Sequence, residues 1–257
     1  MSTMTHHATP APRSIPGSPL FEARDIVAGY GESRVLHGAT LRVGEGETLA
    51  LLGRNGSGRS TLLKTIMRLI AGTGSIMMAG VELARAKPHE AARAGIGYVP
   101  ENRAIFPDLT VRENLSIGLP QRHRAPQAGP RGPQWSEDEF FELFPNLKRR
   151  ANVAGGVLSG GEQQMLTICR ALMGEPRLLL IDEPTEGLSL AMIDQVAGLI
   201  REAARRGVAI LLVEQKLTIA LDVCQRINVM GHGQIVFDGS VPAFQSDPAI
   251  RSEWLEV

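Results

Sequence analysis

The residues best suited to chemistry form a glycine-rich segment at positions 53–61, which reads Gly-Arg-Asn-Gly-Ser-Gly-Arg-Ser-Thr. The segment follows the apolar run 48–52 and opens a helical pattern that begins at Leu62. Its glycines let the backbone curl so that successive N–H groups point inward, and the helix N-terminus behind them adds a positive dipole end. This order of strand, loop and helix predicts a cradle for the phosphates of a nucleotide.

One residue departs from the phosphate-binding pattern Gly-x-x-x-x-Gly-Lys-[Ser/Thr], because Arg59 stands where the pattern has lysine. Lysine presents a compact ammonium to the β- and γ-phosphates, whereas the guanidinium of arginine is longer, planar and forked. The loop amides and the positive charge would still hold ATP. Alignment of the γ-phosphate would suffer, and alignment supplies most of phosphoryl-transfer catalysis. We therefore predict nucleotide binding with slowed hydrolysis at this loop.

Two carboxylates, Asp182 and Glu183, end the apolar run 178–181. In an open α/β sheet, ligands bind at the carboxyl ends of the strands, so this pair can serve the same nucleotide. Asp182 is suited to hold Mg²⁺ through its water shell, and Glu183 is suited to orient or deprotonate the attacking water. An acidic turn before Pro184 is the plainer interpretation, but the glycine loop upstream favours the functional one.

The segment 158–164 reads Leu-Ser-Gly-Gly-Glu-Gln-Gln, and Ser159 and Glu162 have the spacing of a capping box. That spacing alone predicts only the start of a helix. A cap does not require Gly160 and Gly161, however, and these glycines let the backbone approach a phosphate at a helix N-terminus. The segment resembles the signature motif of ATP-binding-cassette (ABC) ATPases, usually Leu-Ser-Gly-Gly-Gln, and the resemblance extends from about position 20 to the end of the chain.

This resemblance implies an α/β fold of the P-loop NTPase type, with a mostly parallel sheet, an N-terminal antiparallel β subdomain and an inserted small helical subdomain. In the family, two nucleotide-binding domains close head to tail on two ATPs, so each nucleotide lies between one chain's glycine loop and the other's signature. The resemblance thus implies ATP and Mg²⁺ as cofactors and a sister or identical ATPase chain as partner. The implied site residues are Tyr30, Gly53, Arg54, Asn55, Gly56, Ser57, Gly58, Arg59, Ser60, Thr61, Glu101, Ser159, Gly160, Gly161 and Gln163 for the nucleotide, Ser60, Glu101 and Asp182 for the metal, and Glu183, Gln215 and Arg59 for catalysis.

Four of the matched positions have particular consequences. Tyr30 matches the aromatic residue that stacks on adenine, although a turn tyrosine is the plainer interpretation. Glu101 occupies the place of the Q-loop glutamine, which keeps an oxygen ligand but adds a charge. Gln215 stands where the family usually has a switch histidine, and its amide can reach a γ-phosphate but cannot shuttle a proton. Leu190 replaces a common proline, so the resemblance implies an altered contact across the dimer.

Glu101 and Gln215 are both typical of the subgroup of ABC ATPases that serves branched-chain amino-acid importers and related systems for urea or other amides. The amino-acid sequences of segments 98–115 and 251–255 are also similar to those of this subgroup. The resemblance thus implies an ATP-hydrolysing subunit of a bacterial importer, which docks on two membrane permease subunits through the surface near Glu101 and the helical subdomain, and which depends indirectly on a solute-binding protein. The alternative is a nucleotide-binding regulatory subunit with weak or no hydrolysis, because of Arg59.

Composition excludes other classes of function. The chain has 257 residues, with 27 basic and 27 acidic side chains, so no basic field indicates nucleic acid as a partner. Cys169 and Cys224 lie in apolar stretches without metal-ligand spacing, which favours a reducing cytosol over a disulfide framework. No apolar run approaches the roughly 18 residues of a membrane span, and residues 1–19 lack the apolar centre of a signal peptide. We expect a cytoplasmic protein, peripheral on the inner face of the cell membrane.

Strands alternate with helices along the sequence, which predicts a parallel α/β core that positions these residues. Apolar runs at 48–52, 96–99, 178–181 and 208–213 predict its buried strands. We expect a disordered tail at 1–19 and the nucleotide-binding domain at 20–257, with a helical subdomain at about 103–173 that contains a flexible loop at 120–133. Further expectations are short β segments at 21–24 and 34–36 around a turn at 29–31, and helices at 62–72, 89–94, 158–173 and 191–205.

Overall fold

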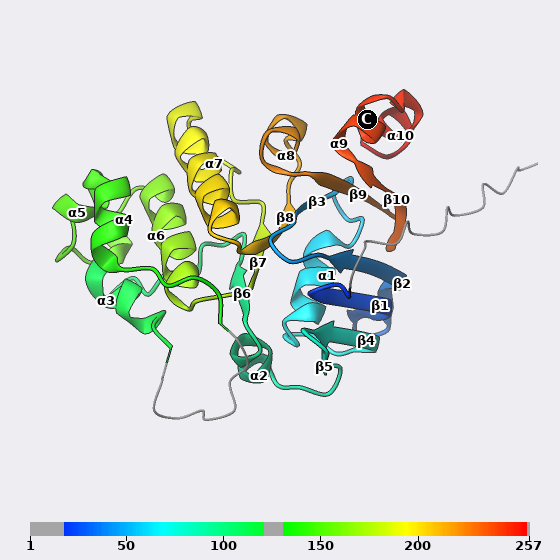
Figure 1. Ribbon diagram of the computed structural model, residues 1–257, viewed down its shortest axis with the longest axis horizontal. Coiled ribbons are helices and arrows are strands. Elements are labelled where there is room, and N and C mark those ends of the chain that lie inside the picture. The colour runs from blue at the N-terminus through cyan, green and yellow to red at the C-terminus, as the bar shows by residue number, and fades with distance from the viewer. Residues whose placement is uncertain (1–17, 121–130, 256–257) are drawn as a thin grey trace, which may run out of the picture.

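The computed structural model describes residues 18–120 and 131–255, which form two sheets and the helices that cover them (Figure 1). Most of the predicted tail 1–19 and of the predicted loop 120–133 lies outside the described residues. None of the helices in the described ranges combines the length and the apolar character that a membrane crossing requires.

The larger sheet has six strands in the order β10-β9-β3-β8-β7-β6. These are β3 (Thr48–Leu52), β6 (Ile96–Val99), β7 (Leu178–Asp182), β8 (Ala209–Val213), β9 (Arg226–Gly231) and β10 (Gln234–Ser240). All neighbouring pairs are parallel except β9 and β10, which confirms the mostly parallel sheet. The strands β9 and β10 were not predicted from the sequence. Because parallel strands end at the same edge, the segments that follow β3, β6, β7 and β8 meet there.

The smaller sheet is antiparallel, in the order β2-β1-β4-β5, with β1 (Phe21–Tyr30), β2 (Ser33–Val43), β4 (Gly72–Met78) and β5 (Val81–Glu82). It confirms the expected antiparallel unit, but its first two strands are much longer than the predicted segments. The predicted turn at 29–31 is wrong in extent, since Gly29 and Tyr30 pair with Arg34 and Ser33 in the ladder. Strand β1 continues past the predicted segment through a register shift beside Asp25, whose φ is 53°.

The helices are α1 (Arg59–Ile66), α2 (Pro88–Arg93), α3 (Val111–Ile117), α4 (Glu137–Leu143), α5 (Pro145–Arg149), α6 (Gly160–Met173), α7 (Leu190–Arg205), α8 (Leu217–Val223), α9 (Val241–Gln245) and α10 (Pro248–Trp254), with a 3₁₀ turn at Gly155–Val157. Helix α1 starts at Arg59, earlier than predicted, and its C-cap is Met67. Helix α6 starts two residues later than predicted, because the Ser159 hydroxyl caps it by accepting from the Glu162 N–H. Figure 1 places α3 to α6 together at one side of the molecule.

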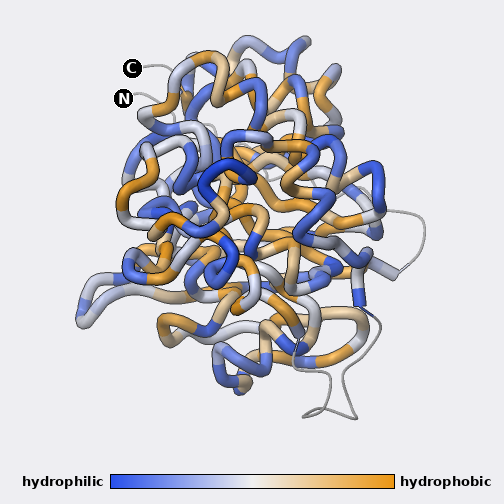
Figure 2. Tube along the Cα trace, turned by 90° about the vertical axis from the view of Figure 1, so that its left-hand side faces the viewer, coloured by the Kyte–Doolittle hydropathy of each residue, from blue (hydrophilic) through white to orange (hydrophobic). Residues whose placement is uncertain are grey.

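The larger sheet has a hydrophobic core on each face. Side chains alternate along β3, so that Leu49 and Leu51 join the core with α1 and the antiparallel sheet, whereas Ala50 and Leu52 join the core with α6 and α7. Strands β7 and β8 alternate in the same way. Figure 2 shows hydrophobic segments gathered in the interior and hydrophilic ones toward the outside. A strand buried on both faces is rigid, so the loops at its end are held in fixed positions.

Candidate functional site

The glycine loop between β3 and α1 has the geometry of a phosphate cradle. Gly53 has φ 156°, and a Cβ there would lie 2.5 Å from the Met230 carbonyl oxygen and 2.7 Å from Ser57 Oγ. Gly58 caps α1 in the left-handed region with φ 109°. The Ser57 hydroxyl is buried and has no hydrogen-bond partner among the described residues. An orphaned hydroxyl beside backbone that admits no side chain fits the approach of phosphate oxygens.

Ser60 and Asp182 form a contact between the start of α1 and the end of β7. The Ser60 Oγ donates to Asp182 Oδ1 at 3.0 Å, and Asp182 is 1% exposed. Burial raises the pKa of Asp182, and the bond from Ser60 and the cations of Lys64 and Arg59 oppose that rise. A hydroxyl and a carboxylate at this edge are the hard oxygen donors that suit Mg²⁺. Ser60 and Asp182, which the sequence predicts as metal ligands, thus present their oxygen atoms side by side.

Arg59 leaves the glycine loop and reaches the ends of β7 and β8. Its Nη2 donates to Glu183 Oε1 at 2.8 Å and to Asn55 Oδ1 at 3.2 Å, and its Nη1 donates to the Glu214 carbonyl oxygen at 3.0 Å. Only 5% of Arg59 is exposed. Burial lowers the pKa of this guanidinium, and the Glu183 carboxylate is the largest opposing influence. The cation expected to face phosphate is thus paired with the expected catalytic carboxylate.

Glu183 accepts a second hydrogen bond on its other oxygen, from Gln215 Nε2 at 2.7 Å. Its backbone has φ 46°, a strained conformation for a residue with a side chain, and its N–H donates to the Val213 carbonyl at 3.0 Å. Burial raises the pKa of Glu183, while Arg59 and Gln215 oppose that rise. The three residues predicted to be catalytic are therefore joined in one chain of side-chain hydrogen bonds, Arg59–Glu183–Gln215.

Two other predicted nucleotide residues lie in exposed positions. Glu101 follows β6, and one oxygen each of Glu101, Glu183 and Glu186 lie within 4.8 Å of one another. No sequence motif marks Glu186, so its place beside these carboxylates was not predicted. Tyr30 ends β1 with 49% of its surface exposed, so its ring is accessible to a planar ligand.

The signature segment begins α6. The Gln163 amide donates to the carbonyls of Gly155 and Leu158 at 3.3 and 3.2 Å, which ties the helix to the preceding turn. A Cβ on Gly160 would lie 2.8 Å from Arg103 Nη1, and the sequence analysis had assigned Arg103 no role. Among the hydrogen bonds and ion pairs between described residues, none joins this segment to the glycine loop.

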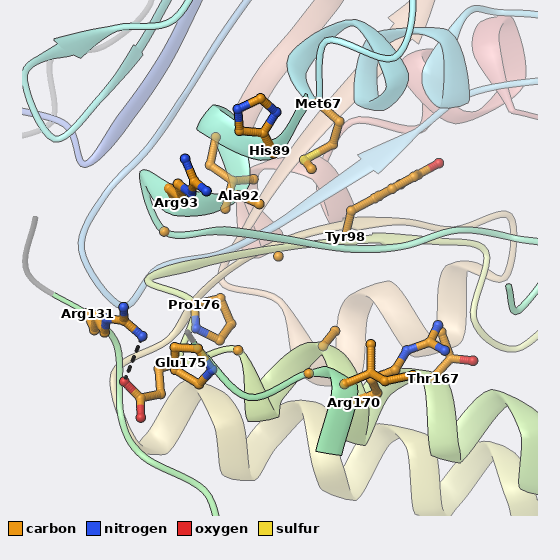
Figure 3. Close-up of a pocket in the computed structure, with 18 of the residues that line it drawn as sticks. Met67, His89, Ala92, Arg93, Tyr98, Arg131, Thr167, Arg170, Glu175 and Pro176 are labelled. Atoms are coloured by element: carbon orange, nitrogen blue, oxygen red, sulfur yellow. Dashed lines mark ion pairs between the residues drawn. The ribbon is translucent and has the colours of Figure 1, made fainter. Parts of the chain in front are cut away.

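A pocket of about 660 Å³ lies between the end of α1, α2 and β6 on one side and α3 and α6 on the other. Figure 3 shows Met67, His89 and Tyr98 facing it from the first side and Thr167 and Arg170 from the second. Leu69 and Ile117, which also line it, are about half exposed. The pocket lies beside the helical subdomain, but Glu101, the other landmark of the predicted docking surface, is not among its lining residues.

The most informative residue that the sequence analysis missed is Glu214, which lies between β8 and Gln215. It is a buried carboxylate, 2% exposed, and only its contacts with a distant segment reveal it. The sequence of residues 213–215, Val-Glu-Gln, is similar to the importer subgroup, but the role assigned there fell on Gln215 and not on Glu214. Cys169 and Cys224 are both buried, with free thiols.

Comparison with known proteins gives consistent results. The sequence pattern of the family described as "ABC transporter" matches residues 36–186. The chain is 40% identical over 227 residues to the high-affinity branched-chain amino acid transport ATP-binding protein BraG of Pseudomonas aeruginosa, a match that covers 88% of this chain and 95% of that one. It is 30% identical to the lipopolysaccharide export system ATP-binding protein LptB of Haemophilus influenzae, with 92% and 97% covered.

A solved structure adds a comparison of the fold. The dimeric structure of a post-hydrolysis state of an ATP-binding cassette, bound to ADP and phosphate, superposes with a TM-score of 0.71 at 25% identity. The match covers 86% of this chain and 98% of that one. The likeness therefore extends over most of the chain.

Proposed function

The chain belongs to the ABC transporter family, as an ATP-binding subunit. We propose that this subunit hydrolyses ATP to power a bacterial importer of branched-chain amino acids or related solutes. The observation that carries the proposed hydrolysis is the convergence of Ser60, Asp182, Glu183 and Gln215 at one edge of the sheet. The relative named for branched-chain amino acid transport supports the solute class. A relative named for lipopolysaccharide export is also similar, so the solute rests on Glu101, Gln215 and the degree of identity.

The proposed roles follow from the contacts. The amides of loop 53–58 and the Ser57 hydroxyl hold the phosphates, and Tyr30 offers a face for the adenine. Ser60, Asp182 and Glu101 would hold Mg²⁺, which supplies charge neutralisation on the phosphates. Glu183 accepts a proton from the attacking water, and Gln215 holds the Glu183 carboxylate in its orientation.

This chain also carries the signature residues that would contact the nucleotide bound by a second cassette. We propose that Ser159, Gly160 and Gly161 close on the nucleotide of a sister or identical chain, in a head-to-tail dimer. The dimeric solved cassette supports this arrangement. Leu190, which begins α7 and is 81% exposed, would contribute an apolar contact to that interface. We propose that the pocket of Figure 3 receives the permease subunits, so that the chain would lie on the inner face of the membrane.

A second candidate function is a regulatory subunit that binds nucleotide but hydrolyses it weakly. The Arg59–Glu183 ion pair favours it, because the pair occupies both the loop cation and the carboxylate that would activate water. The two functions differ in turnover and not in binding.

One experiment tests the proposed function. The chain is purified alone and in complex with its permease and ATPase partners, and ATP binding, ATP turnover and uptake into vesicles of leucine, valine and urea are measured. We expect binding in both samples, and turnover and uptake of a branched-chain amino acid in the complex. ATP binding without turnover in the complex would support the regulatory function, and absence of binding would contradict both.

Ser60→Ala is expected to weaken the Mg²⁺ dependence of the reaction. The variant removes the hydroxyl that donates to Asp182, and the apparent Mg²⁺ affinity for ATP turnover should fall by about 10-fold or more. Titration of Mg²⁺ at saturating ATP measures this change. Ser116→Ala, at an exposed helix position, serves as the control and should titrate like the wild type. An unchanged titration for Ser60→Ala would show that this hydroxyl is not a metal ligand.

Turnover is expected to fall on acidification at a higher pH than an ordinary glutamate would cause. Glu183 acts as a base only when ionised, and burial raises its pKa, so it becomes protonated earlier as the pH drops. The pH dependence of turnover in the complex, at saturating ATP, gives the apparent pKa. An acid limb at the usual glutamate pKa would contradict the assignment of Glu183 as the base.

A further inference from the structure

The Glu214 carboxylate lies between two segments that are far apart in sequence. Its Oε1 accepts from the Thr185 N–H at 3.2 Å and from Thr185 Oγ1 at 2.7 Å. Its Oε2 accepts from the backbone N–H groups of Gln215 at 3.1 Å and of Lys216 at 3.4 Å. Glu214 and Thr185 are 2% and 0% exposed. Four uncharged donors thus hold one buried carboxylate, whose two oxygens serve different segments.

The first of these segments leads toward the expected partner chain. Thr185 lies between Glu183, which follows β7, and the start of α7 at Leu190. A second bond supports the same connection, since Lys216 Nζ donates to the Thr185 carbonyl at 3.2 Å. Two residues of the turn after β8, Glu214 and Lys216, therefore both bind Thr185 in the turn after β7.

The second segment carries the amide that contacts Glu183. Gln215 follows Glu214 directly, and its side chain donates to Glu183 Oε2 at 2.7 Å. The Glu214 backbone carbonyl also accepts from Arg59. The Glu214 carboxylate fixes the backbone of Gln215, and a displacement of about 1 Å in such a group can lower a rate by about 100-fold.

On the basis of the proposed function, we propose that Glu214 is a positioning residue of the ATPase reaction. Its carboxylate holds the backbone of Gln215, so that the Gln215 amide orients Glu183. The same carboxylate binds Thr185 and so connects Gln215 to segment 185–190, which would face the partner chain. Glu214 acts through Gln215 and contacts no reacting group itself. A purely structural glutamate would stabilise the same turn without any dependence on the Gln215 side chain, so the two roles predict different behaviour in a double-mutant cycle.

The test is the cycle between Glu214→Gln and Gln215→Ala, measured as ATP turnover and ATP affinity in the transporter complex. Glutamine keeps the shape of Glu214 but presents an NH₂ group to one pair of donors. We expect Glu214→Gln to lower turnover by about 10-fold and to change ATP affinity by less than about 2-fold. In the Gln215→Ala background, the same change should alter turnover by less than about 2-fold. Independent, multiplicative effects in the cycle would overturn the proposal.

Two controls separate a positioning role from loss of structure. Glu47→Gln removes a carboxylate that binds Arg226 and the Gly44 N–H before β3, and it should leave turnover unchanged. Thermal unfolding is recorded for every variant. If Glu214→Gln fails to fold, Thr185→Val, which removes one donor to Oε1, replaces it in the cycle with the same expected dependence on Gln215.

All variants are also made in an Arg59→Lys background, so that slow basal turnover does not conceal an effect. Turnover that Glu214→Gln leaves unchanged in both backgrounds would overturn this inference alone. A complex that binds ATP but turns none over in either background would contradict the proposed hydrolysis, and with it the role of Glu214.

Discussion

Replacing Glu183 by glutamine is expected to lower ATP turnover by about 1,000-fold, within the range that a general base contributes. Glutamine retains the length of the side chain and an acceptor for Arg59, but it cannot take a proton from water. The buried position of Glu183, 9% exposed, leaves little room for bulk water to replace it. Steady-state turnover in the transporter complex measures the loss.

The same variant should still bind ATP, because Glu183 is not part of the glycine loop. Binding of a fluorescent ATP analogue should change by less than about 3-fold, which separates loss of chemistry from loss of the site. Glu202→Gln, at a partly exposed carboxylate near the end of α7 that pairs with Arg205 and Arg206, is the control and should keep wild-type turnover. A loss below about 10-fold for Glu183→Gln would assign the base to another group.

Arg59→Lys is expected to raise turnover by about 10-fold or more. The guanidinium now bonds Glu183 Oε1, Asn55 Oδ1 and the Glu214 carbonyl at the same time. A single ammonium cannot hold all three in that planar arrangement, so lysine should free Glu183 and present a compact charge to the γ-phosphate. The rise should appear in the maximal rate at saturating ATP, with little change in ATP affinity.

Arg59→Ala completes this test, because it frees Glu183 without supplying a cation, and its turnover should fall below that of the wild type. Arg201→Lys, in an exposed ion pair with Asp222, is the matched control and should have no effect. If lysine at position 59 fails to raise turnover in the complex, arginine is compatible with fast chemistry and the predicted slowing is wrong. Equal turnover in the lysine and alanine variants would show that the loop cation has no role in the reaction.

The fold could be predicted well from the sequence, because the signals for its strands and loops lie within short stretches of residues. Apolar runs such as 178–181 identify buried strands, and glycine spacing identifies the phosphate loop; β3, β7 and β8 confirm the strands. Strands β9 and β10 and the full length of β1 were missed, since pairing with neighbouring strands, and not residue pattern, maintains them.

The sequence by itself determined which side chains are available: a glycine loop with arginine in place of lysine, two carboxylates after a buried strand, and a serine-glycine-glycine helix start. Motifs identify such groups because each depends on neighbours within a few residues. Only the tertiary structure decided how they pair. Arg59 meets Glu183 across 124 positions of chain, and Glu214 meets Thr185 across 29. These contacts exist because β3, β8 and β7 lie side by side and end at one edge, an order that no local pattern contains.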